Sequence, residues 1–204
     1  MQEGNMYPPE HHIEEELEKV YRVIETFSFA TVISRTEDDL IVTQIPLILD
    51  RQKGKNGTLI GHIDKNNPHA NYLNNKNISV IFHGPNTYIS PTVYESAQLP
   101  TWNSISVHIK GTVNVTESVG DVRESIIKMT TLLEEGENPY VLEKNNEKMK
   151  SWLNHIVGFN IEINEIVGRF KLSQDKNPKD TELAKQHLIL KNRIGYEDVI
   201  NFVI

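Results

Sequence analysis

The chain has 204 residues, a formal net charge of −7 and no cysteine. The lack of cysteine excludes disulfides, thiolate catalysis and cysteine-bound zinc or iron–sulfur sites. A negative charge is unfavourable for binding DNA or an anionic membrane surface, because a basic face supplies most of the affinity there. The first residues contain no apolar core of a secretory signal, and no apolar run approaches the roughly 20 residues of a transmembrane helix, so we expect a cytoplasmic protein.

The first half of the chain predicts one helix followed by strands. Residues 11–27 carry apolar side chains at spacings of three and four, with acids between them, which predicts an amphipathic helix. Strands are expected at 29–34 and 40–49, and Pro46 within the second indicates an edge or a bulge. The Asn56-Gly57 pair marks a hairpin turn that leads into a strand at 58–63.

The middle of the chain predicts a short helix between strands. Asn67 and Pro68 are typical of the cap and the first residue of a helix. A strand at 79–82 should end at Gly84-Pro85, which leaves a polar loop after it. The next strand, 104–116, alternates apolar and polar residues, and Gly111 in the apolar register predicts a bulge or a close backbone approach.

The C-terminal part predicts helices at 119–135, 146–156 and 180–190 around a strand at 157–173. The roughly six strands have mostly short connections, so an antiparallel arrangement is expected. Their irregular alternation with helices argues against a doubly wound sheet and favours a small β-barrel decorated by helices. We expect one domain over 1–204, with a helical segment at 119–156 and a C-terminal helical tail at 180–204.

Motifs of common cofactor sites are missing or incomplete. The sequence GKNGT at 54–58 lacks the upstream glycine of a phosphate-binding P-loop, and no G-x-G-x-x-G occurs. His62, His83 and His108 could converge as metal or haem ligands. Structural hydrogen bonding is the preferred interpretation for each, because no carboxylate pattern completes a site. No metal site and no catalytic residue can be nominated.

Two stretches could hold a phosphorylated heterocycle. His62, Lys65 and Asn66 surround the start of the expected short helix, where free N–H groups and a lysine would favour an anion. Taken alone, an ordinary capped helix with a surface lysine explains this stretch better. Trp102-Asn103 could stack on a planar heterocycle and hydrogen-bond to it, and a buried tryptophan at a loop end is the alternative.

Several stretches, taken in chain order, resemble the PaiB-type proteins, bacterial negative transcriptional regulators. They belong to the FMN-binding split-barrel group, together with pyridoxamine-phosphate oxidases and flavin reductases. The stretches are MYPPEHH, FATVIS, TQIPLIL, GHIDKNNPHA, VIFHGPNTYISP, PTWNSISVHIKG, IVGFNIEI and GRFKLSQ. The resemblance implies an α+β, mainly antiparallel fold with a six-stranded split β-barrel, and a homodimer with FMN at the subunit interface.

The resemblance also implies roles for individual residues. Phosphate contacts fall to His62, Lys65 and Asn66. Contacts with the isoalloxazine ring or its surroundings fall to Thr43, Gln44, Ile45, Pro46, His83, Tyr88, Ser90, Trp102 and Asn103. The near-terminal motif supplies Lys171, Ser173 and Gln174 for binding or for the interface. The chain departs from the family pattern at Val93 and at Asp64, whose carboxylate is unfavourable beside a phosphate.

Three functions are compatible with these features. The first is a flavin-binding regulator or sensor without turnover. The second is an FMN-dependent oxidoreductase of the pyridoxamine-phosphate oxidase or flavin reductase type, in which the cofactor carries the chemistry. The third is a haem-binding split-barrel protein that uses one of the histidines. The family label allows DNA as a partner, but the net charge does not support it.

Overall fold

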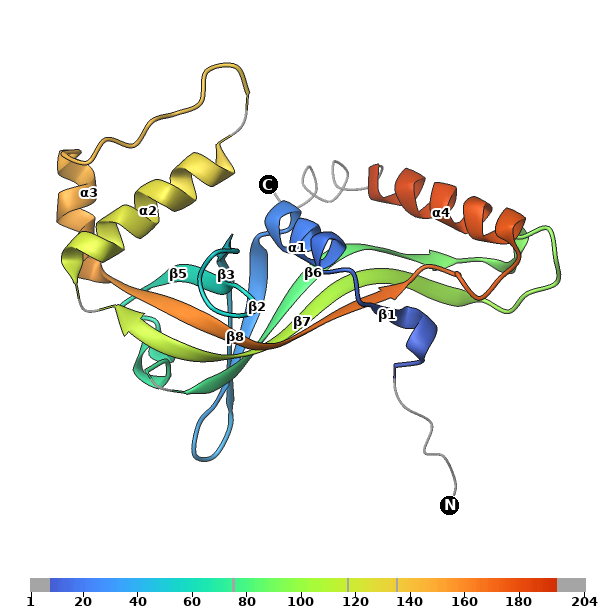
Figure 1. Ribbon diagram of the computed structural model, residues 1–204, viewed down its shortest axis with the longest axis horizontal. Coiled ribbons are helices and arrows are strands. Elements are labelled where there is room, and N and C mark those ends of the chain that lie inside the picture. Colours follow the sequence, from blue (N-terminus) through green and yellow to red (C-terminus); the bar gives the residue numbers. More distant parts are fainter. Residues whose placement is uncertain (1–7, 75, 117, 135, 194–204) are drawn as a thin grey trace. The chain divides into compact units, whose positions relative to one another are not determined.

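The computed structural model describes residues 8–74, 76–116, 118–134 and 136–193. The chain divides into two compact units. One consists of Met1–Val23, His83–Val107 and Val167–Ile204, and the other of Ile24–Phe82 and His108–Ile166. We call them the terminal unit and the central unit, and three long strands contribute residues to both (Figure 1).

One mainly antiparallel sheet of eight strands organises the described chain, with the order β3-β2-β6-β7-β8-β5-β4 and β1 paired to β8. The expected fold class is therefore confirmed, although six strands were predicted. Two differences account for the count: the predicted strand at 40–49 divides at Leu47, and β1 is additional. The strands are β1 (Ile13–Glu14), β2 (Phe29–Arg35), β3 (Leu40–Pro46), β4 (Ile48–Asp50), β5 (Thr58–Asp64), β6 (Asn77–Ile89), β7 (Thr101–Thr116) and β8 (Ile156–Lys171).

The predicted helix at 11–27 begins later than expected. Residues Glu10–His12 form a 3-10 turn, and Ile13–Glu14 pair with Arg169 and Gly168 of β8. Pairing with the sheet satisfies backbone groups that a helix would otherwise bond internally, so tertiary contact prevails over the helical periodicity here. The helix α1 covers Leu17–Thr26 and buries Val20 and Ile24.

The predicted strand end at Gly84-Pro85 is wrong, because β6 continues to Ile89. Pairing of β6 with β2 ends at Phe82, so the missing N–H of Pro85 costs no bond to that neighbour. A Cβ added to Gly84 would lie 3.1 Å from the Ile105 carbonyl oxygen of β7. Glycine thus allows close contact with β7, which flanks this part of β6 in the described sheet.

The predicted close approach at Gly111 is confirmed. A Cβ there would lie 2.5 Å from Ile161 Cγ2 and 2.6 Å from the Glu162 carbonyl oxygen of β8. The neighbouring inward positions Ile109 and Val113 are buried, as the alternation in β7 predicts. This glycine lets β7 and β8 approach each other in the core of the central unit.

Helices α2 (Val119–Leu133) and α3 (Glu147–Trp152) lie side by side, and the 3-10 helix η4 (Leu153–His155) follows them (Figure 1). Val122, Met149 and Leu153 form their shared core. Ser118 and Asn146 cap the two helices by accepting the backbone N–H groups of Asp121 and Met149. The predicted helical segment at 119–156 therefore contains two helices with their own small core.

Helix α4 (Pro178–Arg193) starts at a reciprocal cap. The Asp180 N–H donates to Asn177 Oδ1 at 3.0 Å, and Asn177 Nδ2 donates to Asp180 Oδ2 at 2.8 Å. Asp180 also accepts the Glu95 N–H at 2.8 Å, which attaches this helix to the segment before β7. The predicted tail beyond residue 193 lies outside the described residues, and no helix in the described part could span a membrane.

Candidate functional site

The predicted phosphate-binding residues lie at the end of β5 in the central unit. The short helix is the 3-10 helix η2 (Pro68–Tyr72), and Asn67 caps it by accepting the His69 N–H at 3.0 Å. Asp64 accepts the Asn66 backbone N–H at 2.7 Å. The Lys65 ammonium donates to the Asn154 carbonyl oxygen at 2.6 Å. Several N–H groups that were expected to be free for an anion thus already donate hydrogen bonds to acceptors of the chain itself. One of these acceptors is the Asp64 carboxylate, which binds the Asn66 N–H.

His62 lies two residues before the end of β5 and faces Gly158 across the strand pair. Its Nδ1 is buried and has no hydrogen-bond partner among the described residues. Burial lowers the pKa of the imidazole below its usual value of 6.5, so the ring is neutral at pH 7. A neutral imidazole offers one donor and one acceptor nitrogen, which can bind either kind of group on a ligand.

The β3 residues predicted to meet the flavin divide between two faces of the strand. Thr43 faces inward, and its hydroxyl lies 2.9 Å from His69 Nδ1. Gln44 faces outward, and its Nε2 donates to Thr31 Oγ1 at 3.4 Å. Ile45 and Pro46 are half-buried and pair with Ala30 and Phe29. Only the outward residues can therefore present side chains at the surface of this strand.

The sequence did not indicate the role of His69. The side chain is fully buried, and its Nε2 lies 2.7 Å from Ser34 Oγ. With Thr43 on the other nitrogen, both sides of the ring are hydrogen-bonded, and burial lowers its pKa. Ser34 continues the inward register of Ala30 and Val32 in β2. The position of Ser34 among inward apolar residues was the feature of the sequence that could have indicated a buried polar partner such as His69.

In the terminal unit, two predicted residues form an exposed aromatic pair. The rings of Tyr88 and Trp102 have centroids 6.5 Å apart and planes at 56°. Tyr88 is 47% exposed and Trp102 is 53% exposed. Trp102 Nε1 donates to Asn86 Oδ1 at 3.2 Å, which fixes the indole on the sheet surface. The indole is held by this bond and offers one aromatic face to a planar ligand, and Tyr88 lies at its side.

Asn103, the residue after Trp102, is fully buried in a network of three side chains. Ser173 Oγ donates to Asn103 Oδ1 at 3.1 Å, and the Tyr94 hydroxyl lies 2.8 Å from Ser173 Oγ. Since the serine has a single hydroxyl proton, Tyr94 donates to Ser173. Asn103 Nδ2 has no partner among the described residues, although it is completely buried. An unpaired buried donor costs roughly 1–3 kcal/mol, so a group that accepted its proton would recover that energy.

The near-terminal motif after β8 builds a turn. Ser173 has φ +62, in the left-handed region that a non-glycine residue rarely adopts. Gln174 accepts the Leu172 N–H at 2.7 Å and donates to the carbonyl oxygens of Phe170 and His11. Lys171, the last residue of β8, is half-buried. The motif thus connects the N-terminal segment to the end of β8.

The remaining predicted residues have other local contacts. Ser90 starts the 3-10 helix η3 (Pro91–Val93) by accepting the Thr92 N–H at 3.3 Å. His83 is exposed on β6, and His108 is half-buried on β7. No group of three or more potential metal-binding side chains occurs among the described residues. His62, His83 and His108 thus provide no metal site with neighbouring acids or histidines in this part of the chain.

The three cavities found lie elsewhere in the central unit. Their volumes are about 710, 340 and 330 Å³. Within the described chain, their linings contain none of the predicted cofactor residues. Among the described residues, the predicted ones therefore offer surface groups and buried nitrogens without partners, and none of them lines these three cavities.

Comparisons of sequence identify the family. A family model described as "Putative FMN-binding domain" matches residues 6–165. The curated Protease synthase and sporulation protein PAI 2 from Bacillus subtilis (strain 168) is 30% identical over 177 residues, which are 86% of this chain and 85% of that protein. The chain belongs to the PaiB-type family of FMN-binding proteins. The resemblance noted from its motifs is thereby confirmed, and FMN is the cofactor of the matched family.

Solved structures support the fold of this PaiB-type protein. An FAD and haem binding protein from Mycobacterium smegmatis matches with a TM-score of 0.59 and 14% identity, over 78% of this chain and 73% of the other. A flavocytochrome from Azotobacter vinelandii matches with a TM-score of 0.59 and 13% identity, over 78% and 69% of the two chains. At such identities the likeness concerns the fold alone.

The residues present in the PaiB-type chain fit a flavin in chemical type. Two of the four buried nitrogens without partners among the described residues belong to predicted cofactor residues, His62 and Asn103. Flavin rings carry carbonyl oxygens and ring nitrogens that pair with such groups, and the ring faces suit an aromatic neighbour. The fit is one of chemical type within each unit, and it is compatible with the family's cofactor.

Proposed function

We propose that this protein is a cytoplasmic FMN-binding regulator or sensor whose single FMN-binding domain covers 1–204. The observation that carries the proposal is the amide nitrogen of Asn103, which is completely buried and has no hydrogen-bond partner among the described residues. Evolved cores leave few buried donors unpaired, and a ligand is one ordinary reason for an exception. Family membership names the ligand class as FMN.

Each of the two units, taken by itself, offers groups whose chemistry suits FMN. The Asn103 amide would donate a hydrogen bond, and neutral His62 would donate or accept one. Trp102 and Tyr88 would cover part of the ring system. Lys65 would face the phosphate as a point charge, but it must first leave the Asn154 carbonyl oxygen or share its protons with it. When bound, FMN would supply the redox chemistry that a sensor reads.

A homodimer is the second part of the proposal. On the outward face of β2 and β3, Phe29, Leu40 and Val42 are 59%, 61% and 56% exposed. Because β3 is an edge strand of the sheet, its free backbone groups and apolar side chains favour being covered. We propose a second copy of the chain as the cover. The predicted residues Gln44 and Pro46 lie on the same strand, so the interface would adjoin cofactor residues.

We propose that the protein regulates transcription indirectly, without binding DNA itself. The net charge of −7 opposes phosphate binding by an exposed face. The Bacillus subtilis relative is named for protease synthesis and sporulation, which is compatible with a regulatory role. We propose that the flavin state changes contacts with another protein or a metabolite, and that any effect on transcription follows from that.

The decisive experiment is the absorption spectrum of the purified protein before and after addition of FMN, followed by titration. We expect a bound flavin spectrum and saturable binding below millimolar concentration. Lys65→Ala should weaken FMN binding more than riboflavin binding, since only FMN carries the phosphate. Lys55→Ala, a neighbouring lysine outside the predicted site, is the matched control. Failure of the unmodified protein to bind FMN would reject the proposal.

Two further measurements separate the parts of the proposal. Sedimentation velocity should give a dimer, and Val42→Lys should shift it to the monomer, whereas a monomeric unmodified protein would refute the interface. NAD(P)H oxidation by the flavin-loaded protein should be absent. Steady turnover would replace the sensor with the oxidoreductase alternative, and a Soret band on haem addition that His62→Ala abolishes would favour haem binding.

A further inference from the structure

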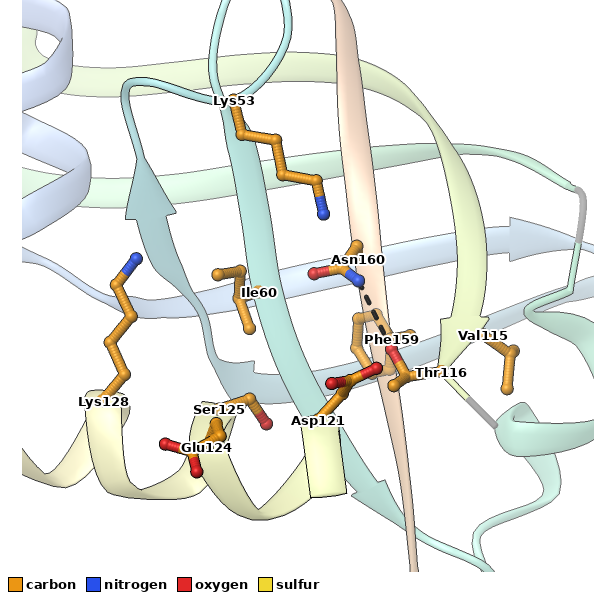
Figure 2. Close-up of a pocket in the computed structure, with 10 residues that line it drawn as sticks. All are labelled: Lys53, Ile60, Val115, Thr116, Asp121, Glu124, Ser125, Lys128, Phe159 and Asn160. Carbon is orange, nitrogen blue, oxygen red and sulfur yellow. Dashed lines mark hydrogen bonds between the residues drawn. The ribbon is translucent and has the colours of Figure 1, made fainter. Parts of the chain in front are cut away.

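A cavity of about 710 Å³ lies in the central unit between α2 and the strands β5, β7 and β8 (Figure 2). Every residue that lines it belongs to that unit. The lining combines two lysines, two acids, three smaller polar residues and three apolar residues. They are Lys53, Lys128, Asp121, Glu124, Thr116, Ser125, Asn160, Ile60, Val115 and Phe159.

The helix presents a polar stripe to this cavity. Asp121, Glu124, Ser125 and Lys128 have the spacing i, i+3, i+4, i+7, which places them on one face of α2. The adjacent stripe, which includes Val122 and Met129, is buried. As in other amphipathic helices, the apolar stripe packs on the sheet, and the polar stripe, with Asp121, Glu124 and Lys128 exposed, borders the cavity.

The floor of the cavity is a pair of residues on neighbouring strands. Ile60 of β5 faces Asn160 of β8, and Asn160 Nδ2 donates to Thr116 Oγ1 at 3.3 Å. Two pairs along, Gly158 contacts Val122 of the helix: a Cβ on this glycine would lie 2.7 Å from Val122 Cγ2. The helix thus contacts the sheet at Gly158, and the open space lies next to that contact.

Two of the four charges around the cavity are already neutralised. Lys128 Nζ lies 3.0 Å from Asp50 Oδ2, and Glu124 pairs with Lys144. Within the described residues, the ammonium of Lys53 and the carboxylate of Asp121 have no ion-pair partner, and they do not pair with each other. Figure 2 shows both groups directed at the space over Asn160 and Thr116. The site therefore offers one ammonium and one carboxylate outside any ion pair of the described residues, and the charge of Lys53 also acts on Asp50.

We propose that this cavity binds a small linear amino carboxylate, which is a zwitterion with an ammonium group at one end and a carboxylate at the other. The ligand carboxylate would meet Lys53, and its ammonium would meet Asp121. The Asn160 and Thr116 groups would bind along the chain, while Ile60 and Val115 would contact its methylenes. None of the predicted cofactor residues lines this site, although His62 follows Ile60 on the same face of β5, and the zwitterion would be an effector in addition to FMN.

The test is isothermal titration of the full chain, with and without FMN, by amino carboxylates of increasing length. Glycine, 4-aminobutanoate and 6-aminohexanoate are suitable probes, and hexanoate and hexylamine are their singly charged counterparts. We expect saturable binding of at least one zwitterion, about tenfold or more tighter than either singly charged analogue. If hexanoate binds as well as the zwitterions, or if no probe binds below roughly 10 mM, the proposal is overturned.

Variants identify the two charges. Lys53→Met and Asp121→Asn should each weaken binding at least about tenfold, whereas Lys55→Met on the same hairpin should leave it unchanged. The double exchange Lys53→Glu with Asp121→Lys should restore binding, because a linear zwitterion can enter in the opposite direction. Equal losses in Lys53→Met and Lys55→Met would contradict the assignment. Unchanged flavin binding in these variants separates the outcome from that of the FMN proposal.

Discussion

Two buried polar side chains, His69 in the central unit and Asn103 in the terminal unit, show opposite solutions to the same problem. Both are completely buried. Each ring nitrogen of His69 lies within hydrogen-bond distance of a hydroxyl, whereas the Asn103 amide nitrogen has no partner among the described residues. A fully paired group contributes to the stability of the unit around it. A group left unpaired lowers that stability and is useful only when a ligand completes it.

The largest expected effect is a loss of stability when His69, the fully hydrogen-bonded side chain, is removed. His69→Ala should lower the free energy of unfolding by about 3 kcal/mol, because it leaves a cavity and two hydroxyls without partners. Urea denaturation measures the change. His83→Ala, at an exposed histidine on β6, serves as the control and should alter the free energy of unfolding by less than about 0.5 kcal/mol. A similar loss in both variants would show that burial does not distinguish the two histidines.

The second largest effect is expected at Asn103, whose substitution should weaken FMN binding. Asn103→Leu should weaken FMN binding about tenfold or more, while the apo protein loses about 1 kcal/mol or less, since the unpaired amide is removed together with one hydrogen bond. Fluorescence titration and thermal denaturation give the two values. Tyr94→Phe removes a hydroxyl of the same network without touching the amide, and it should bind FMN normally. If Tyr94→Phe loses as much affinity, the network and not the amide is responsible.

A smaller effect concerns pH. Burial lowers the folded-state pKa of His62 and His69 below 6.5, and burial together with His11 does so for His12. The unfolded chain then binds more protons, so the free energy of unfolding is greatest above pH 6.5 and falls as the pH decreases below it.

Urea denaturation at pH 7.5, 6.5 and 5.5 should show this slope, and His69→Gln should reduce it. The lowered pKa values of Asp50 and Asp180 affect stability only below about pH 5, so they do not overlap with the measured range of pH 5.5 to 7.5. A free energy of unfolding that is constant from pH 7.5 to pH 5.5 would contradict the prediction.

The smallest stability effect is expected at the aromatic pair. Trp102→Ala removes an exposed ring that has one hydrogen bond, so the free energy of unfolding should change by less than about 1 kcal/mol. FMN binding should nevertheless weaken several-fold, because a stacking surface is lost. Leu99→Ala removes another exposed apolar side chain nearby in sequence and should leave FMN binding unchanged.

Much of the fold could be predicted from periodicity and turn residues. The alternation in β7, the cap at Asn67 and the close approach at Gly111 are all found. The errors arise where a partner strand decides the outcome. Ile13 pairs with β8 although its spacing is helical, and Pro85 remains inside a strand because β2 pairing has already ended. Such partners are distant in sequence, so local patterns do not reveal them.

The candidate site was predicted less completely than the fold. Motifs pointed to Asn103 and His62, and the structure gives each a buried nitrogen without a partner among the described residues, although whether they bind FMN stays a prediction. The motifs did not indicate that Thr43 holds His69 or that Lys65 contacts the Asn154 carbonyl oxygen. A residue type shows what a side chain can bind, but only the fold shows which groups nearby bind it first.

Gly158 limits which substitutions the contact between α2 and the sheet can accept. Its backbone is ordinary extended strand, so the requirement for glycine there comes from the neighbouring helix and not from the chain's own conformation. Any larger residue would have to push Val122, and with it the first turns of α2, away from the sheet. The distance between helix and sheet, and thereby the size of the space beside them, depends on the absence of a single methyl group. Relatives that carry alanine or a larger residue at this position are expected to have a displaced helix and different ligand preferences.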